Sequence, residues 1–118
     1  DMAGDDSQSI EVDLECEPGV LDFRLISLLE GLEPFGVNNS QPVFLSRNVE
    51  VDGFKYIGKE ESHGKFITVK DGLEIVGWNM GKVMEKKMEK GVVDLLYSPE
   101  INSFLGKRSI RLSLLDID

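Results

Sequence analysis

Short strand-like segments dominate the chain from Val43 onward, and their order constrains the fold more than any other feature. Residues 43–58 are rich in Val, Phe, Tyr and Ile, and Asp52-Gly53 within them marks either a hairpin turn or a glycine bend in one long strand. Lys65–Lys70 alternates, Asp71-Gly72 turns the chain, and Leu73–Trp78 forms a second strand-like run. This pattern predicts an antiparallel hairpin.

The period then changes to that of a helix. Between Met80 and Lys90, apolar residues recur at three- and four-residue spacing, and Gly91 follows as a C-terminal cap. Val92–Tyr97 and Ile110–Ile117 are predicted as the last two strands. We expect these two strands to be joined by a connection that contains Ser98-Pro99, Asn102 and Gly106-Lys107-Arg108.

Five short strands with one helix between the third and the fourth are the order of the five-stranded OB-fold barrel. Closing the sheet into a barrel removes the exposed strand edges that an open sheet would present. We therefore predict a mainly β fold in which residues 43–118 form an OB-fold domain.

An acidic strand-helix segment is predicted ahead of this domain. Ile10–Cys16 alternates apolar and acidic residues, which is typical of a short strand with one buried face. Asp22 is a suitable N-cap for a helix with a stripe of leucines, and Glu33–Pro42 is rich in turn formers. We expect residues 1–9 to be a disordered linker and residues 10–42 to form the segment and its hinge.

The net charge of −9 is concentrated in the first third of the chain. Residues 1–36 carry ten acidic side chains and one basic, whereas residues 37–118 carry twelve of each. A domain with balanced charge can still present a local basic surface to phosphate. The composition therefore leaves nucleic-acid binding open.

Several other classes of site are excluded by the residues themselves. The single cysteine, Cys16, cannot form an internal disulfide, and with the single histidine, His63, it cannot supply the four ligands of a structural zinc site. These counts favour the cytoplasm. No apolar run approaches the roughly 20 residues that span a bilayer, and no spacing of carboxylates singles out a catalytic acid and base.

Residues 32–44, with the sequence LEPFGVNNSQPVF, resemble the first motif of the C-terminal OB domain in RecJ-type exonucleases. The core of this motif is Leu-x-Pro-Phe-Gly followed by Asn and then Pro-Val-Phe. Asn38 stands where the family usually has glycine, and Ser40 where it usually has proline. The resemblance continues through Lys55–Gly58, Val93–Tyr97 and other short runs, and covers almost everything after Ile10.

The resemblance implies a parent enzyme that degrades single-stranded DNA from 5′ to 3′, with Mn²⁺ or Mg²⁺ held by two other domains. One histidine, His63, cannot provide the carboxylates and imidazoles of a two-metal phosphodiesterase. We therefore expect a binding module without cofactor, which guides single-stranded DNA to the catalytic domains. The alternative is a protein-interaction domain that docks on the parent enzyme or on a partner such as a single-strand-binding protein.

Two groups of residues are predicted to contact nucleic acid. Phe66 is placed on the outer face of its strand if Ile67 and Val69 fill the barrel, and an OB fold stacks bases on that face. Phe104 is expected to be exposed in the last connection. The cationic candidates lie in the connections that flank the expected groove: Lys59, His63, Lys65, Lys107, Arg108 and Arg111.

Trp78 and two neighbouring features remain ambiguous in the sequence. Burial of Trp78 beside Val76 is favoured over a role as a base platform, because both faces of its strand carry apolar residues. Gly77 allows either a backbone or a flat base to approach closely. Tyr56 fits either the core or the surface.

Overall fold

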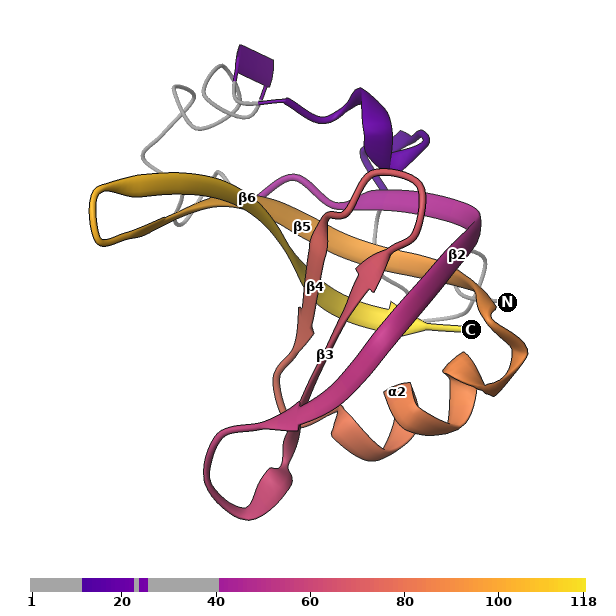
Figure 1. Ribbon diagram of the computed structural model, residues 1–118. Helices are drawn as coiled ribbons and strands as arrows, with labels where there is room; N and C mark the ends of the chain where they lie inside the picture. The colour runs from indigo at the N-terminus through magenta and orange to yellow at the C-terminus, as the bar shows by residue number, and fades with distance from the viewer. Residues whose placement is uncertain (1–11, 23, 26–40) are drawn as a thin grey trace.

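The computed structural model describes residues 12–22, 24–25 and 41–118. Five strands form a barrel, and one α-helix lies between the third and the fourth of them (Figure 1). The elements in chain order are β1 (Leu14–Glu15), η1 (Pro18–Val20), β2 (Phe44–Ile57), η2 (Lys59–Glu61), β3 (His63–Thr68), β4 (Glu74–Gly77), α2 (Gly81–Lys87), η3 (Met88–Lys90), β5 (Val92–Phe104) and β6 (Lys107–Ile117).

The barrel is closed by pairing between its first and fourth strands. The strand order is β2-β3-β4-β6-β5, and β5 pairs antiparallel with β2 from Tyr97 against Phe44 to Val92 against Glu50. Strands β4 and β6 pair in parallel, and the other neighbours are antiparallel. The predicted mainly β OB-fold barrel, with its helix between strands three and four, is confirmed.

Strand β2 is one long bent strand rather than a hairpin. Its pairing with β3 shifts register between Asp52 and Lys55, so Asp52-Gly53 forms a bend in a continuous strand. The predicted hairpin follows, because β3 and β4 pair antiparallel from Gly64 against Gly77 to Ile67 against Glu74.

The barrel interior is filled by apolar side chains from every strand. Phe66, Ile75, Leu95, Tyr97 and Leu112 are all fully buried in one continuous cluster. Such close packing makes the barrel a rigid frame for the side chains on its outer surface.

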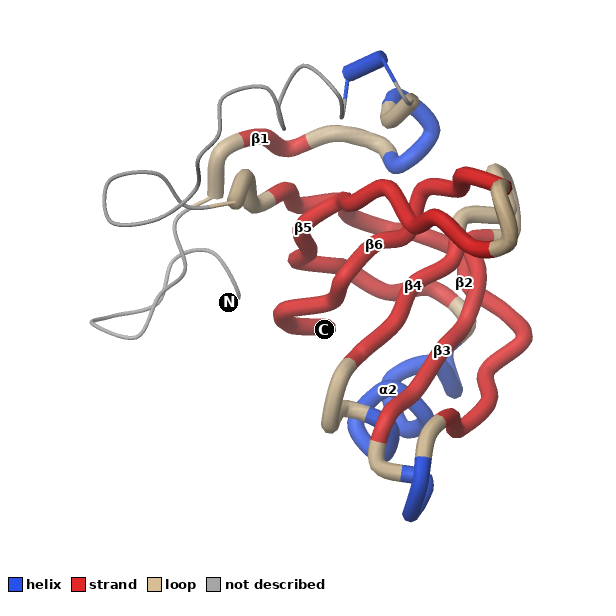
Figure 2. Tube along the Cα trace, turned by 90° about the vertical axis from the view of Figure 1, so that its left-hand side faces the viewer, coloured by secondary structure: helices blue, strands red, loops and turns tan. Residues whose placement is uncertain are grey.

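The α-helix covers one end of the barrel, where glycines let it approach (Figure 2). A Cβ atom on Gly77 would overlap the thioether of Met84, and one on Gly64 would lie 2.9 Å from the same sulfur. Tyr56 packs over Gly81 and donates a hydrogen bond of 2.8 Å to Glu85 Oε1. The close approach expected at Gly77 therefore comes from the helix, and Tyr56 has a structural role.

The described part of the acidic segment lies along β2. The predicted strand is reduced to Leu14–Glu15, which pairs in parallel with β2, and Leu14 is exposed rather than buried. Asp22 caps the backbone N–H of Leu25 at 2.8 Å, as its predicted N-cap role requires. The remainder of the predicted helix and most of the hinge lie outside the described residues.

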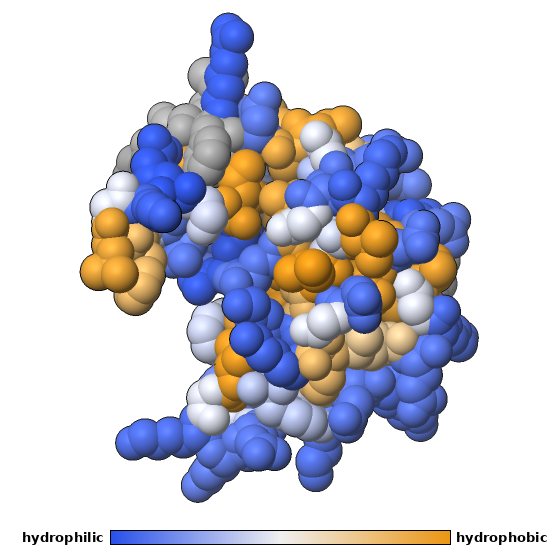
Figure 3. Space-filling view, viewed as in Figure 1, coloured by the Kyte–Doolittle hydropathy of each residue, from blue (hydrophilic) through white to orange (hydrophobic). Residues whose placement is uncertain are grey.

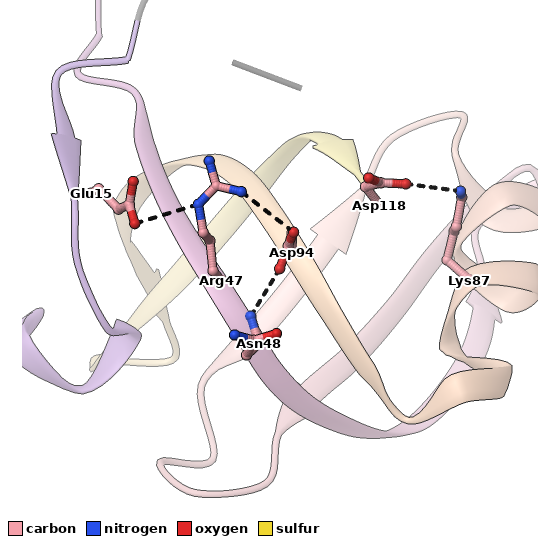
Figure 4. Close-up of polar contacts among 6 residues, drawn as sticks. All are labelled: Glu15, Arg47, Asn48, Lys87, Asp94 and Asp118. Carbon is pink, nitrogen blue, oxygen red and sulfur yellow. Dashed lines mark hydrogen bonds and ion pairs between the residues drawn. The ribbon is translucent and has the colours of Figure 1, made fainter. Parts of the chain in front are cut away.

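Polar contacts tie this segment to the barrel. The Tyr97 hydroxyl donates to Ser46 Oγ at 2.7 Å, because the Ser46 hydroxyl itself donates to the carbonyl of Cys16 at 2.6 Å. Burial raises the pKa values of Tyr97 and Cys16. Figure 4 shows Arg47 between Glu15, at 3.4 Å, and Asp94, at 3.7 Å. The described acidic residues at this side thus neutralise a barrel cation.

Candidate nucleic-acid interface

One outer face of the barrel is formed by β3, β4 and β6. The registers place Lys65 beside Val76, and Glu74 beside Arg111, on the side opposite the core residues Phe66 and Ile75. We call this surface the Trp78 face. Its outward residues are His63, Lys65, Ile67, Glu74, Val76, Trp78, Arg111 and Ser113.

Phe66 does not belong to this face, and the prediction that it points outward is wrong. Its side chain is 0% exposed, whereas Ile67 and Val69 are exposed. The reversed alternation puts Thr68 inside as well, and its Oγ1 accepts the backbone N–H of Leu73 at 3.0 Å. Because the turn satisfies this hydroxyl, Thr68 is buried at little cost. Phe66 is therefore a core residue.

Trp78 takes the exposed position instead, and the favoured prediction of its burial is also wrong. Its side chain is 47% exposed. The His63 ring meets the indole edge-on with centroids 5.1 Å apart, and the Arg111 guanidinium carbon lies 5.7 Å from the indole centroid. These two contacts, from β3 and β6, orient an aromatic surface that remains accessible to solvent.

The turn after β4 fixes the indole further. Asn79 follows Trp78 with a left-handed φ of 60°, and its backbone N–H donates to His63 Nδ1 at 2.8 Å. His63 therefore has a positioning role. Val76 points to the same face by register but is only 2% exposed. The face is a packed platform, organised before any ligand binds.

Both cations on this face have a carboxylate partner. Arg111 donates to Glu100 Oε1 from Nε at 2.9 Å and from Nη2 at 2.8 Å. Lys65 Nζ lies 2.6 Å from Glu74 Oε2. The pair with Glu100 restrains the guanidinium that lies near the indole, and both pairs reduce the net positive charge of the face.

A long hairpin extends one side of this face. The prediction of a connection from Ser98 to Ser109 is wrong, because β5 continues to Phe104 and pairs with β6, which begins at Lys107, through a two-residue turn at Leu105-Gly106. Pro99 is tolerated within β5 because β2 pairs only with residues 92–97 of this strand. Figure 3 shows the surface hollowed between the projecting hairpin and the β2–β3 connection.

The hairpin distributes its basic residues over both of its sides. Phe104 pairs with Lys107, and Glu100 with Arg111, without a register shift between them. Lys107 and Phe104 therefore share the side of Arg111. Arg108 points to the opposite side, together with Ile110, which packs against the core. The structure separates two cations that the sequence grouped as one patch.

The remaining predicted residue lies at the other edge of the hollow. Lys59 is exposed in η2, beside the acidic Glu60 and Glu61. His63 follows at the start of β3 and contacts Trp78, so it links this connection to the platform. Phe104 is 71% exposed at the opposite edge, as predicted.

The other clusters and cavities of the described residues lie away from the Trp78 face or carry mixed charge. Among these residues no three His, Cys, Asp or Glu side chains are gathered so that they could hold a metal ion. A small pocket of about 100 Å³ lies beside β1, but acidic and basic residues line it together, with Arg47 and Lys70 near Glu17 and Asp71. Over the same residues, no helix is long and apolar enough to cross a membrane.

Sequence reasoning missed Glu100 and Asn79 and ranked Trp78 below Phe66. A usable signal was present in two glycines. Gly64 and Gly77 have the same parity as Phe66 and Ile75, and glycines beneath a packed helix mark the inner face of their strands. Glu100 carries no such signal, because only the folded hairpin brings it to Arg111.

Comparison with known proteins agrees with this architecture. Residues 12–116 match the family model described as the RecJ OB domain. The single-stranded-DNA-specific exonuclease RecJ of Bacillus subtilis (strain 168) is 29% identical over 110 residues, which are 90% of this chain and 14% of that protein. This chain therefore spans about one seventh of the length of the curated relative that it matches.

Two crystal structures of RecJ from Thermus thermophilus have the same fold. The structure in complex with Mg²⁺ superposes with a TM-score of 0.70 at 23% identity, over 92% of this chain and 16% of that one. The structure in complex with Mn²⁺ gives 0.72 at 22% identity, over 98% and 16%. With most of its length matched by the family model and its barrel shared with these structures, the chain belongs to the RecJ OB-domain family.

Proposed function

We propose that this chain binds single-stranded DNA on the Trp78 face. The observation that carries the proposal is the half-exposed indole of Trp78, oriented between His63 and Arg111 on the outer surface of an OB fold. An indole held in this way can stack on any base, because every base has a π-face. Sequence-tolerant binding of an unpaired strand is the function that such a platform serves.

The positions of the polar groups support the same assignment. Arg111 and Lys107 follow the side of the hairpin that borders the platform, where they can contact the phosphates of a strand whose bases stack on Trp78. The relative in Bacillus subtilis is described as specific for single-stranded DNA. We infer the same class of ligand here.

In the full-length protein, the proposed role of this domain is to guide the strand to catalytic domains that lie outside this chain. Mn²⁺ or Mg²⁺ would act in those domains, in a cytoplasmic exonuclease of DNA repair and recombination. Because the described residues hold no candidate metal cluster, we expect the isolated chain to release no mononucleotides from single-stranded DNA when either ion is added. Hydrolysis that a chelator abolishes would contradict the assignment as a binding module.

Replacement of Trp78 tests the platform. Trp78→Ala should weaken binding of a single-stranded oligonucleotide by about 1 to 3 kcal/mol, the usual contribution of one stacked base, and Trp78→Phe should recover part of it. Fluorescence anisotropy of a labelled oligonucleotide measures the affinity. Val92→Ala, which shortens an exposed apolar side chain elsewhere on the barrel, is the control. Equal affinity of Trp78→Ala and the wild type would refute the proposal.

The structure offers less support for the alternative, in which the domain docks on another protein, than for DNA binding. Glu15 contacts Arg47, Asp13 Oδ2 accepts the backbone N–H of Val43, and Glu17 lies 3.8 Å from Lys70. These acidic side chains of the described segment engage the barrel, and their charge is thereby partly neutralised before any partner protein is met.

A further inference from the structure

The tip of the β5–β6 hairpin has a conformation that its sequence disfavours. Leu105 and Gly106 have φ values of 52° and 80°, and a two-residue turn with two positive φ values usually contains Asn-Gly or Asp-Gly. Leucine is poorly suited to this region because its Cβ crowds the backbone. Residues held in disfavoured backbone conformations cluster at ligand-binding and active sites.

The same turn exposes two neighbouring apolar side chains. Leu105 is 86% exposed and Phe104 is 71% exposed. Single apolar residues on a surface are ordinary, but these two adjoin one another at the end of a ribbon that projects from the barrel (Figures 1 and 3). They cover no part of the core, so packing within the described chain does not explain them.

The surroundings of the tip favour a polyanion. In a chain of net charge −9, residues 101–115 contain three basic side chains and no acidic one. Lys107 lies directly opposite Phe104 across the ribbon. Some nucleic-acid-binding proteins insert apolar side chains between stacked bases, while neighbouring cationic side chains contact the phosphates.

The tip also lies within reach of a strand bound at the platform. Phe104 and Lys107 share the side of Arg111, which contacts Trp78. Phe104 lies four positions beyond Glu100 along β5, a rise of about 13 Å, which is close to the length of four stacked nucleotides.

We propose that Phe104 and Leu105 form a wedge that inserts between neighbouring bases of the bound single strand and unstacks them. This inference rests on the proposed function, since it assigns a second contact to the same strand. The platform accepts a base from one direction, and the wedge separates bases a few nucleotides away. An unstacked strand of this kind is extended and held in one register.

The test uses short oligonucleotides that carry 2-aminopurine, whose fluorescence rises when it is unstacked, at successive positions. Saturating wild-type protein should raise the emission at some positions. Leu105→Asn should remove at least half of that rise and weaken binding, up to about fivefold. Because asparagine tolerates positive φ, this variant should melt no lower than the wild type, so a lost signal is not a lost fold.

Matched variants distinguish the wedge from the platform. Phe104→Ser should also reduce the emission rise. Trp78→Ala should weaken binding but keep the rise once the protein is saturating. An unchanged emission rise with Leu105→Asn would overturn the wedge alone and leave the tip as a docking contact for another protein. Failure of the wild type to bind any oligonucleotide would overturn both the wedge and the proposed function.

Discussion

The guanidinium carbon of Arg111 lies 5.7 Å from the centroid of the Trp78 ring, although the two residues are 33 positions apart in the sequence. Strand β6 brings Arg111 beside β4 by parallel pairing, and Glu100 Oε1 on β5 accepts hydrogen bonds from Nε and Nη2 of the guanidinium. The arrangement couples a stacking surface to a charge that can meet phosphate. The proposed contribution of base stacking on Trp78 and that of phosphate contact by Arg111 therefore depend on the same pair of residues.

If DNA binds as proposed, Glu100 competes with phosphate for Arg111, so removing the charge of Glu100 should strengthen binding. We expect Glu100→Gln to tighten binding of single-stranded DNA about two- to fivefold, equivalent to up to ~1 kcal/mol. The salt dependence should steepen by about 0.7 in slope if Arg111 then neutralises one further phosphate. Titrations at several salt concentrations measure both quantities. Weaker binding by Glu100→Gln would show that the carboxylate serves mainly to position Arg111.

The two sides of the hairpin should contribute unequally. Lys107→Ala should weaken binding for every sequence and reduce the salt slope by about 0.7, because Lys107 shares the side of Arg111. Arg108→Ala should change the slope less, since Arg108 points to the other side of the ribbon. Lys90→Ala, on the exposed surface of η3, is the control for loss of one positive charge. A larger effect of Arg108 than of Lys107 would place the strand on the opposite side of the hairpin.

Stability should fall at alkaline pH because of Tyr97. Burial raises the pKa of its hydroxyl above the unfolded value of about 10. The folded state therefore keeps the proton more tightly, and this contribution is fully present below pH ~10 and is lost as the pH rises further. The loss is about 1.4 kcal/mol per pH unit in the free energy of unfolding.

Tyr97→Phe isolates this effect. The variant should lose about 1 kcal/mol at neutral pH, because the hydrogen bond to Ser46 is absent. Its unfolding free energy should then decline less steeply than that of the wild type above pH 10. Burial raises the pKa of Cys16 and the Tyr97 hydroxyl lowers it, so both proteins should be compared in a Cys16→Ala background. Parallel curves for the two proteins in urea titrations would contradict the buried, protonated hydroxyl.

The order of elements was predictable from the sequence because it depends on changes of period. The hairpin across Asp71-Gly72 and the helix after Met80 both have strong local signals, a turn dipeptide and an amphipathic spacing. The sequence carries no comparable local signal for the continuation of β5 through Ser98-Pro99. It depends on pairing with β6, which local turn propensity does not report.

Alternation alone did not predict which residues of β3 and β4 point into the barrel and which point to the Trp78 face. Two alternating pairs could each face the core: Phe66 with Thr68, or Ile67 with Val69. The second pair is the more hydrophobic. The first pair is inside because the helix packs against glycines of the same parity and because the turn satisfies the Thr68 hydroxyl. Both reasons are tertiary, so the assignments of Phe66 and Trp78 were exchanged.

The central claim is that single-stranded DNA lies on Trp78, and the only tryptophan of the chain is its own reporter. Its emission should be that of a half-exposed indole, accessible to a collisional quencher such as acrylamide. Titration with a short oligothymidine at low salt should quench the emission and protect it from acrylamide, with saturation at one site. Emission and accessibility that stay constant while anisotropy shows the oligonucleotide to be bound would contradict the claim.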